Sequence, residues 1–387
     1  MNATACGDDM KRNLGILKEE LNNASIKRIS KPLLIWYDRN KRILPWREKP
    51  TPYGVWISEI MLQQTRVEAV KPYYERFMHA LPDIAALADV PEEDLLKLWE
   101  GLGYYNRARN LKKAAQKIME LYGGEMPAEY DALLALPGIG SYTGGAIASI
   151  AFGLGKPAVD GNVLRVLSRL RADVRNISDE KVRKAVEAEL EDSMPKDRPG
   201  DFNQALMEIG ACVCMPNGAP RCEACPLAFE CKAHANGSEL AYPVKEAKKA
   251  RTKEDKTVLL IRDAGRVALT KRPSKGLLAG MYEFPCLAGH VSAKGVAKYL
   301  SEHGLKVLRI LPMGDAKHVF THKEWHMIGY EVRVDELAKA IADEETGKWI
   351  YVDPKETREK YPIPSAYEVY AAKLSMIRGK KRFLEED

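Results

Sequence analysis

The sequence predicts a multidomain protein in which an all-α domain is followed by an α+β domain. Three observations lead to this expectation. A chain of 387 residues is longer than one typical hydrophobic core organises. Apolar residues recur at three- and four-residue steps from about residue 30 to residue 234, which is the period of an amphipathic helix. Short β-prone runs then follow a polar, charged stretch at 235–256.

We therefore expect five segments along the chain. They are a polar N-terminal extension at 1–29 with one short helical pattern, the all-α domain at 30–234, a linker at 235–256, the α+β domain at 257–377 and a charged tail at 378–387.

The composition is that of an ordinary folded protein, with 45% hydrophobic and 29% charged residues. No run approaches the roughly eighteen apolar residues of a membrane-spanning helix. The first residues lack the apolar core of a secretory signal, so we expect a cytoplasmic protein. A net charge of +6 and a pI near 8.7 are compatible with binding to nucleic acid but do not decide it.

Start and stop signals punctuate the helical half. Apolar residues at Leu33–Tyr37, Ile57–Met61 and Leu95–Trp99 follow the helical period. One helix is expected to begin at Pro91–Glu93 and to end before Gly101–Gly103. We expect nine or ten helices here and find no segment with the alternating pattern of a strand.

The sequence after the linker has a different pattern, in which short β-prone runs replace the helical period. Residues 256–261 and 266–269 form β-prone runs around an Asp-Ala-Gly turn, as expected for two neighbouring strands. The other expected elements are strands at 325–332 and 348–352 and helices at about 292–303 and 335–342.

Cysteines gather at the end of the helical half. Cys214, Cys222, Cys225 and Cys231 have the spacing C-x7-C-x2-C-x5-C, and four thiolates suit either tetrahedral zinc or a [4Fe–4S] cluster. Zinc sites usually pair two short knuckles, and only one is present, so the spacing favours the cluster. Cys212 is an alternative to Cys214, but it reads more naturally as a small buried side chain.

Residues 136–140, Leu-Pro-Gly-Ile-Gly, lie between two helical patterns. Gly138 and Gly140 permit a tight turn whose N–H groups, with the start of the following helix, suit a phosphate. Such a turn also serves as a plain connection between helices, so this motif alone does not establish function.

Two carboxylates stand out from their surroundings. Glu59 interrupts an apolar helix, so we expect a partly buried acid with a raised pKa rather than a residue on a solvated face. Asp160 follows an apolar run, and a helix is expected to begin at Val163. Capping of that helix is the favoured reading for Asn162, whereas a buried Asp160 calls for a partner or a cationic transition state.

The hairpin, Asp160 and the four-cysteine tail together resemble the endonuclease III superfamily of helix-hairpin-helix base-excision glycosylases. Residues 45–72, 99–111 and 136–170 are similar in particular to the MutY family of adenine DNA glycosylases, and the likeness spans roughly residues 30–375. One departure is the first cysteine interval, which has seven residues where the family has six.

This resemblance implies a monofunctional enzyme that hydrolyses the N-glycosidic bond of adenine mispaired with 8-oxoguanine or guanine in duplex DNA and leaves an abasic site. It also implies a [4Fe–4S] cluster, a monomer, and a place at the nucleoid if the source is a prokaryote.

The resemblance also assigns roles to residues. Glu59 would protonate N7 of the flipped adenine, and Asp160, oriented by Asn162, would stabilise the resulting cation. Tyr142 stands where strand-cutting relatives have a lysine nucleophile, and a phenol forms no Schiff base. It would instead stabilise the cation or hydrogen-bond Glu59 or Asp160.

Two further groups of residues follow from the same resemblance. The adenine pocket would be lined by Arg42, Trp46, Arg47 and Gln204. DNA or the lesion would be contacted by Gln64, Thr65, Tyr104, Gly138, Gly140, Phe320, Thr321 and His322.

Residues 276–285 and 318–322 resemble the Nudix-like domain with which the MutY family recognises 8-oxoguanine. Thr321 replaces a serine of the family, and it keeps the hydroxyl. The glutamate-rich catalytic box of active Nudix hydrolases is missing from the sequence, so we expect no pyrophosphatase activity.

Two alternatives remain open. A helix-hairpin-helix glycosylase could act on another mispaired base, such as thymine opposite guanine, although the second domain and the pair Gln64 and Tyr104 argue against it. A non-catalytic DNA-binding relative would have lost the chemistry, although the presence of both Glu59 and Asp160 argues against that.

Overall fold

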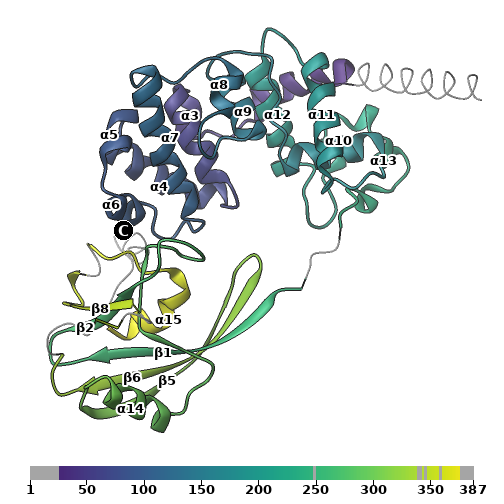
Figure 1. Cartoon of the computed structure of the whole chain (residues 1–387). Coiled ribbons are helices and arrows are strands. Elements are labelled where there is room, and N and C mark those ends of the chain that lie inside the picture. Colours follow the sequence, from purple (N-terminus) through teal and green to yellow (C-terminus); the bar gives the residue numbers. More distant parts are fainter. Residues whose placement is uncertain (1–25, 247–249, 338–341, 344–346, 357–359, 375–387) are drawn as a thin grey trace, which may run out of the picture. The chain divides into compact units, whose positions relative to one another are not determined.

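The structure is a computed structural model, and it describes residues 26–246, 250–337, 342–343, 347–356 and 360–374. Two compact units divide the chain (Figure 1). One runs to Asp89 and resumes over Asn110–Ala247, and the other combines Val90–Arg109 with the residues from Lys248 onward. Among the described residues, no helix is long and apolar enough to cross a membrane.

The first unit is built of helices, which confirms the expected all-α domain. Residues 26–40 form the first of them. The others are α2 (Pro45–Glu48), α3 (Pro52–Leu62), α4 (Val67–Ala80), α5 (Ile84–Asp89), α7 (Asn106–Tyr122), α8 (Tyr130–Leu134), α9 (Ser141–Ile150), α10 (Gly161–Arg171), α11 (Glu180–Ser193), α12 (Pro199–Cys212) and α13 (Lys232–Ala235). The described helices outnumber the nine or ten expected because α2, α5, α8 and α13 span only four to six residues, too few to show a period.

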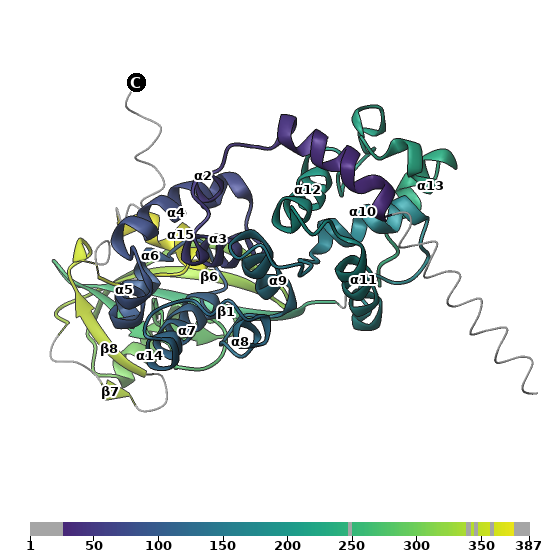
Figure 2. The same cartoon turned by 90° about the horizontal axis from the view of Figure 1, so that it is seen from above.

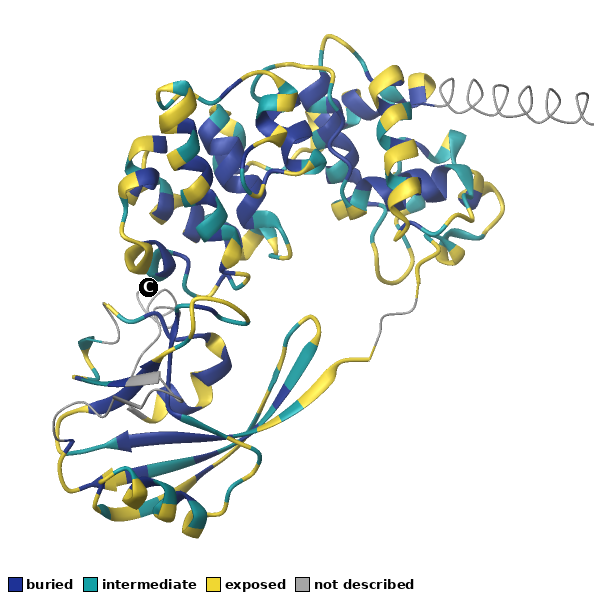
Figure 3. Ribbon diagram, in the orientation of Figure 1, coloured by how far each residue is buried: buried dark blue, intermediate teal, exposed yellow. Residues whose placement is uncertain are grey.

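Two groups of packed helices in this unit position the candidate site. Helix α3 contacts α9 and α4, and its residues Tyr53–Met61 are all buried. The helix at 26–40 shares a core with α10 and α12 (Figure 2). Buried residues gather on the faces where the helices meet (Figure 3).

The connection from α9 to α10 is held from two sides. Gly145 of α9 lies so close to this segment that an added Cβ would stand 1.9 Å from the carbonyl oxygen of Pro157. On the other side, the Asn203 side chain donates to the Lys156 carbonyl at 2.8 Å and accepts from the Ala158 N–H at 3.1 Å. These contacts fix the backbone that leads into Asp160.

The second unit contains a mixed sheet with the strand order β5-β6-β1-β2-β8-β7; β3 pairs with β2, and β4 pairs with β1. Strands β1 and β6 are parallel, and the other pairs are antiparallel. The elements are α6 (Glu92–Leu98), β1 (Thr252–Arg262), β2 (Val267–Lys271), β3 (Tyr282–Glu283), β4 (Cys286–Ala288), α14 (Ala293–Glu302), β5 (Val307–Val319), β6 (Lys323–Val334), β7 (Ala342–Asp343), β8 (Gly347–Val352) and α15 (Glu368–Ala371).

The run of apolar residues in β1 is buried on both faces. Val258 and Leu260 join the core with Tyr367 and Tyr370, at the α15 end of the chain, on one side. Leu259 and Ile261 join α14 on the other side (Figure 1). Strand residues alternate between the two faces, so a continuous apolar run requires cover on both. This arrangement confirms the expected α+β class.

Three expectations about elements need correction. The helix expected at 335–342 is wrong for its described part, since 335–337 are irregular and Ala342–Asp343 form β7, while 338–341 lie outside the described residues. Strand β5 was not expected, because polar residues interrupt its alternation. Strand β1 begins at Thr252, inside the expected linker. The tail at 378–387 and residues 1–25 of the extension lie outside the described residues.

The close approach at Gly145 gives a stability prediction. Gly145→Ala should lower the free energy of unfolding by about 1–3 kcal/mol, because overpacking against a backbone carbonyl outweighs a gain of about 1 kcal/mol in helix propensity. Gly155→Ala is the matched control, since its added Cβ would meet nothing within 4 Å. Urea denaturation of the two variants measures the difference, and equal midpoints would contradict the close approach.

Candidate active site

A cavity of about 580 Å³ lies in the helical unit. Helices α2, α3, α9 and α12 and the start of α10 contribute to its wall. All predicted catalytic and adenine-pocket residues line it, with two of the predicted DNA contacts: Glu59, Asp160, Tyr142, Asn162, Arg42, Trp46, Arg47, Gln204, Gln64 and Thr65. Residues that are far apart in the sequence therefore meet in one hollow.

Glu59 is a buried acid, as the sequence predicted, and the reading as a solvated residue is wrong. Its residue exposure is 6%, and the Tyr142 hydroxyl donates a hydrogen bond to its Oε2. Burial raises the pKa of Glu59 to about 7. The Tyr142 hydrogen bond and the charge of Arg47 work in the opposite direction, whereas the charge of Asp160 adds to the rise.

Tyr142 extends from α9 toward Glu59. Burial and the two carboxylates raise the pKa of its hydroxyl well above the ordinary value, so the group remains a proton donor at neutral pH. Of the roles the sequence left open, the structure contains the hydrogen bond to Glu59.

Asp160 both lines the cavity and caps α10. Its Oδ1 accepts from the N–H groups of Asn162 and Val163, each at 2.8 Å, and its Oδ2 accepts from the Asn162 side chain at 2.6 Å. Burial raises the pKa of Asp160, although these hydrogen bonds oppose the rise. The cap expected at Asn162 is therefore wrong: α10 begins at Gly161, and Asp160 is the cap.

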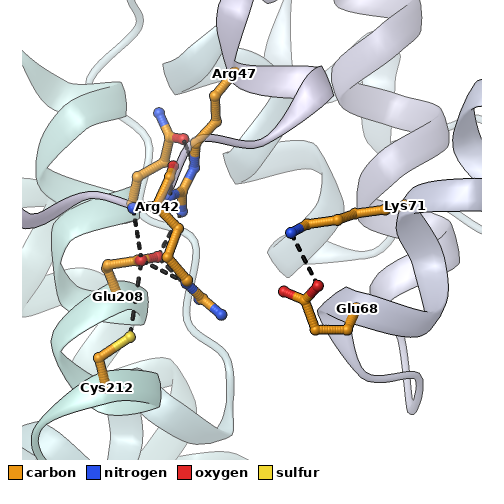
Figure 4. Close-up of polar contacts among 7 residues, drawn as sticks. Arg42, Arg47, Glu68, Lys71, Glu208 and Cys212 are labelled. Carbon is orange, nitrogen blue, oxygen red and sulfur yellow. Dashed lines mark hydrogen bonds and ion pairs between the residues drawn. The ribbon is translucent and has the colours of Figure 1, made fainter. Parts of the chain in front are cut away.

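The other wall of the cavity depends on an acid that the sequence analysis missed. Glu208 accepts from Arg42 Nε at 2.6 Å and Nη2 at 3.0 Å, and from Arg47 Nη2 at 2.8 Å (Figure 4). Arg47 Nε donates in turn to the Gln204 side-chain oxygen at 3.0 Å. The position of Glu208 one turn after Gln204, on an otherwise apolar stretch, is the signal that could have found it. Trp46 is buried nearby.

Two predicted DNA contacts share an unusual backbone. Gln64 and Tyr104 are exposed, and both have left-handed backbone angles, with φ of 59° and 48°. Such conformations are unfavourable for residues other than glycine and gather at functional sites. The Arg107 guanidinium lies 5.5 Å from the centre of the Tyr104 ring. Thr65, the next residue after Gln64, is half-buried.

The predicted hairpin has the expected turn. Gly138 adopts a left-handed φ of 80°, and Gly140 is the residue that precedes α9. An added Cβ on Gly138 would lie 2.8 Å from that of Asn110, so the position requires glycine for space as well. Neither glycine lines the cavity.

The predicted lesion contacts lie at the turn between β5 and β6. Thr321 and His322 are exposed there. Phe320 is half-buried, with its ring centre 4.7 Å from that of Trp325. Part of the Phe320 ring is therefore committed to the core of the second unit.

The four predicted ligand cysteines line one small cavity, which fits a metal cofactor. Arg169 Nη1 donates to Cys214 Sγ at 3.3 Å, so a cation faces the thiols. Cys212 lies outside this cavity, 3.8 Å from Glu208 (Figure 4), and the alternative that used it as a ligand is wrong. His234 and Glu239 place ligand atoms within 4.8 Å of Cys222 and offer further donors.

Comparisons with known proteins agree with this geometry. Residues 57–192 match the HhH-GPD superfamily base excision DNA repair protein family, and residues 257–373 match the NUDIX domain. The solved structure of a thermostable thymine-DNA glycosylase is also similar, with 30% sequence identity and a TM-score of 0.50. The similarity covers 55% of this chain and 98% of that structure's chain.

Two relatives extend over most of the chain. The adenine DNA glycosylase of Homo sapiens is 36% identical over 350 residues, which cover 75% of this chain and 64% of the human protein, so this chain spans less than two thirds of that relative. The adenine DNA glycosylase of Buchnera aphidicola subsp. Baizongia pistaciae (strain Bp) is 36% identical over 292 residues, which cover 75% of this chain and 82% of the relative. The chain therefore belongs to the adenine DNA glycosylase family.

Proposed function

We propose that this chain removes adenine from mispairs with 8-oxoguanine or guanine in duplex DNA and leaves an abasic site. The observation that carries the proposal is a pair of carboxyls, the buried Glu59 and the half-buried Asp160, in the wall of one cavity. Cleavage of an N-glycosidic bond needs an acid for the leaving base and a negative charge for the cation that forms. The two carboxyls supply these two roles.

Glu59 is the acid. A pKa of about 7 leaves a substantial fraction of its carboxyl protonated at neutral pH, and a general acid works best under that condition. Transfer of this proton to N7 of the flipped adenine lets the base take the electron pair of the breaking C1′–N9 bond and leave as a neutral molecule. The hydroxyl of Tyr142 holds the Glu59 carboxyl in place.

Asp160 faces the sugar. Two backbone N–H groups and Asn162 fix both of its oxygens, so its carboxylate need not reorganise when positive charge develops at C1′. Addition of water to C1′ then completes the hydrolysis. Tyr142 carries no amine, so no Schiff base forms and the strand stays intact.

The four-cysteine cavity would hold a [4Fe–4S] cluster through Cys214, Cys222, Cys225 and Cys231. The single short knuckle favours this group over zinc. The cluster would serve as a structural crosslink, and Arg169 would offset its negative charge.

The partner in this proposal is duplex DNA, bound by a monomer in the cytoplasm. The hairpin at Gly138 and the exposed Gln64 and Tyr104 would engage the duplex beside the flipped base. The β5–β6 turn, with Thr321 and His322 exposed, would contact 8-oxoguanine. Mispaired thymine is the second candidate substrate, since 55% of this chain is similar to a thymine-DNA glycosylase.

A single-turnover assay tests the substrate. Duplexes with adenine opposite 8-oxoguanine, adenine opposite guanine, and thymine opposite guanine are incubated with protein, with and without hot alkali afterwards. We expect alkali-dependent breaks at adenine in the first two duplexes. Strand breaks without alkali would contradict the monofunctional mechanism. Release of thymine alone would mean that mispaired thymine, and not adenine, is the substrate.

The same assay tests Glu59. Glu59→Gln should slow adenine release by about 10²–10⁴-fold, because the general acid is lost, while binding to the duplex is retained. Glu68→Gln is the control, since that acid is exposed and pairs with Lys71 on its own helix. Equal rates of adenine release for the two variants would mean that Glu59 is not the general acid.

The cofactor is tested by composition. Cys212→Ser should contain as much iron and acid-labile sulfide as wild type, whereas Cys231→Ser should lose both, because Cys231 lines the cavity and Cys212 does not. Purified wild type that holds zinc without iron would contradict the cluster.

A further inference from the structure

Glu208 is the most enclosed carboxylate beside the proposed active site. Its side chain has 0% exposure, and its oxygens accept from Arg42 and Arg47 (Figure 4). Burial alone would raise the pKa of Glu208, but the hydrogen bond from Arg42 and the charge of Arg47 outweigh it and lower the pKa to about 2. Glu208 is therefore an anion at neutral pH.

The two arginines depend on Glu208. Arg42 uses its backbone N–H as well as Nε and Nη2 on this carboxylate. Glu68 is the acid on the neighbouring helix α4, and it pairs with Lys71 instead (Figure 4). Because Arg47 also donates to Gln204, the carboxylate fixes Gln204 indirectly.

These residues form a wall between two cavities. A second cavity of about 590 Å³ adjoins the catalytic one, and Arg42, Arg47 and Gln204 line both. The position of these side chains therefore decides the shape of the catalytic cavity along this wall. A guanidinium that is released from Glu208 has open space to move into.

The charge of this wall also acts on Glu59. The groups that face Glu59 are Tyr142 from α9, Asp160 from the start of α10 and Arg47 from α2, and the charge of Arg47 favours the ionised form. The groups that face Glu208 are Arg42, Arg47, the phenol of Tyr37 and the Cys212 thiol. Glu208 is thus the anion that offsets the two arginines near the proposed acid.

We propose that Glu208 is a positioning residue of this site: its carboxylate holds and neutralises Arg42 and Arg47, so that Glu59 meets the base as a neutral acid. The inference rests on the proposed function for its kinetic part only. Its electrostatic part concerns the protein without DNA.

The test compares Glu208→Gln with Glu189→Gln. Glu189 is a matched control because its side chain is 9% exposed and forms an ion pair with Arg171, which is 7% exposed, away from both cavities. Single-turnover adenine release at pH 7 should fall on the order of 100-fold in Glu208→Gln and stay near the wild-type rate in the control.

A second readout separates positioning from general loss of structure. Infrared difference spectra, with Glu59→Gln as reference, follow protonation of the Glu59 carboxyl in DNA-free protein. The midpoint should move down by about one pH unit in Glu208→Gln, because Arg47 is no longer neutralised. The double variant Glu208→Gln/Arg47→Gln also removes the positive charge of Arg47, so its midpoint should return toward the wild-type value.

An unchanged midpoint in Glu208→Gln would overturn the inference, as would adenine release at the control's rate. If wild type itself releases no adenine, the proposed function fails, and the infrared titration still decides whether Glu208 governs Glu59. If Glu208→Gln does not fold, the double variant and Arg47→Gln still test whether the charge of Arg47 controls protonation of Glu59. Removal of Arg47 alone should raise the midpoint of Glu59 protonation.

Discussion

A carboxyl group loses its hydration when it is buried, and helix α3 buries Glu59 along its most enclosed stretch. The hydrogen bond from the Tyr142 hydroxyl and the charge of Arg47 both favour the ionised carboxyl, but together they do not offset the loss of hydration. The proton is therefore retained near neutral pH. The rest of the cavity is arranged around this constraint: α9 supplies the donor, α10 the second carboxyl, and α12 the opposite wall.

Helix α12 links these parts. Asn203 clamps the backbone that leads to Asp160, and Gln204 and Glu208 set the arginine wall. The opposite side of the clamp is the glycine face of α9 at Gly145. Because the same helix also ends where the cysteine cavity begins, the fold of the metal site and the geometry of the carboxyls rest on shared packing. Substitutions along α12 that keep the fold are therefore expected to affect chemistry.

Much of this could be predicted from the sequence. Periodicity was sufficient for the longer helices but not for α2, α5, α8 and α13, which are too short to show a period. The apolar run of β1 indicated a strand, although its start at Thr252 was not expected. The apolar neighbours of Glu59 indicated its burial. The position of Glu208 on an apolar stretch could have indicated a buried acid, but its pairing with Arg42, which is distant in sequence, could not be predicted. The cap of α10 was expected two positions too late, at Asn162 instead of Asp160, because the exact start of a helix depends on local hydrogen bonds. Strand β5 could not be predicted, because its pairing with β6 defines it and its sequence lacks an alternating pattern.

If protonation of Glu59 limits base release, the single-turnover rate on adenine opposite 8-oxoguanine must follow the pKa of this carboxyl, and the pH dependence of that rate is the most direct test. The rate should be highest at mildly acidic pH and fall above pH about 7, approaching a tenfold decrease per pH unit, as Glu59 loses its proton. A rate that rises as pH increases from 4 to 6 and stays level beyond 8 would mean that the ionised carboxylate is the active form, and it would contradict the role of Glu59 as a general acid.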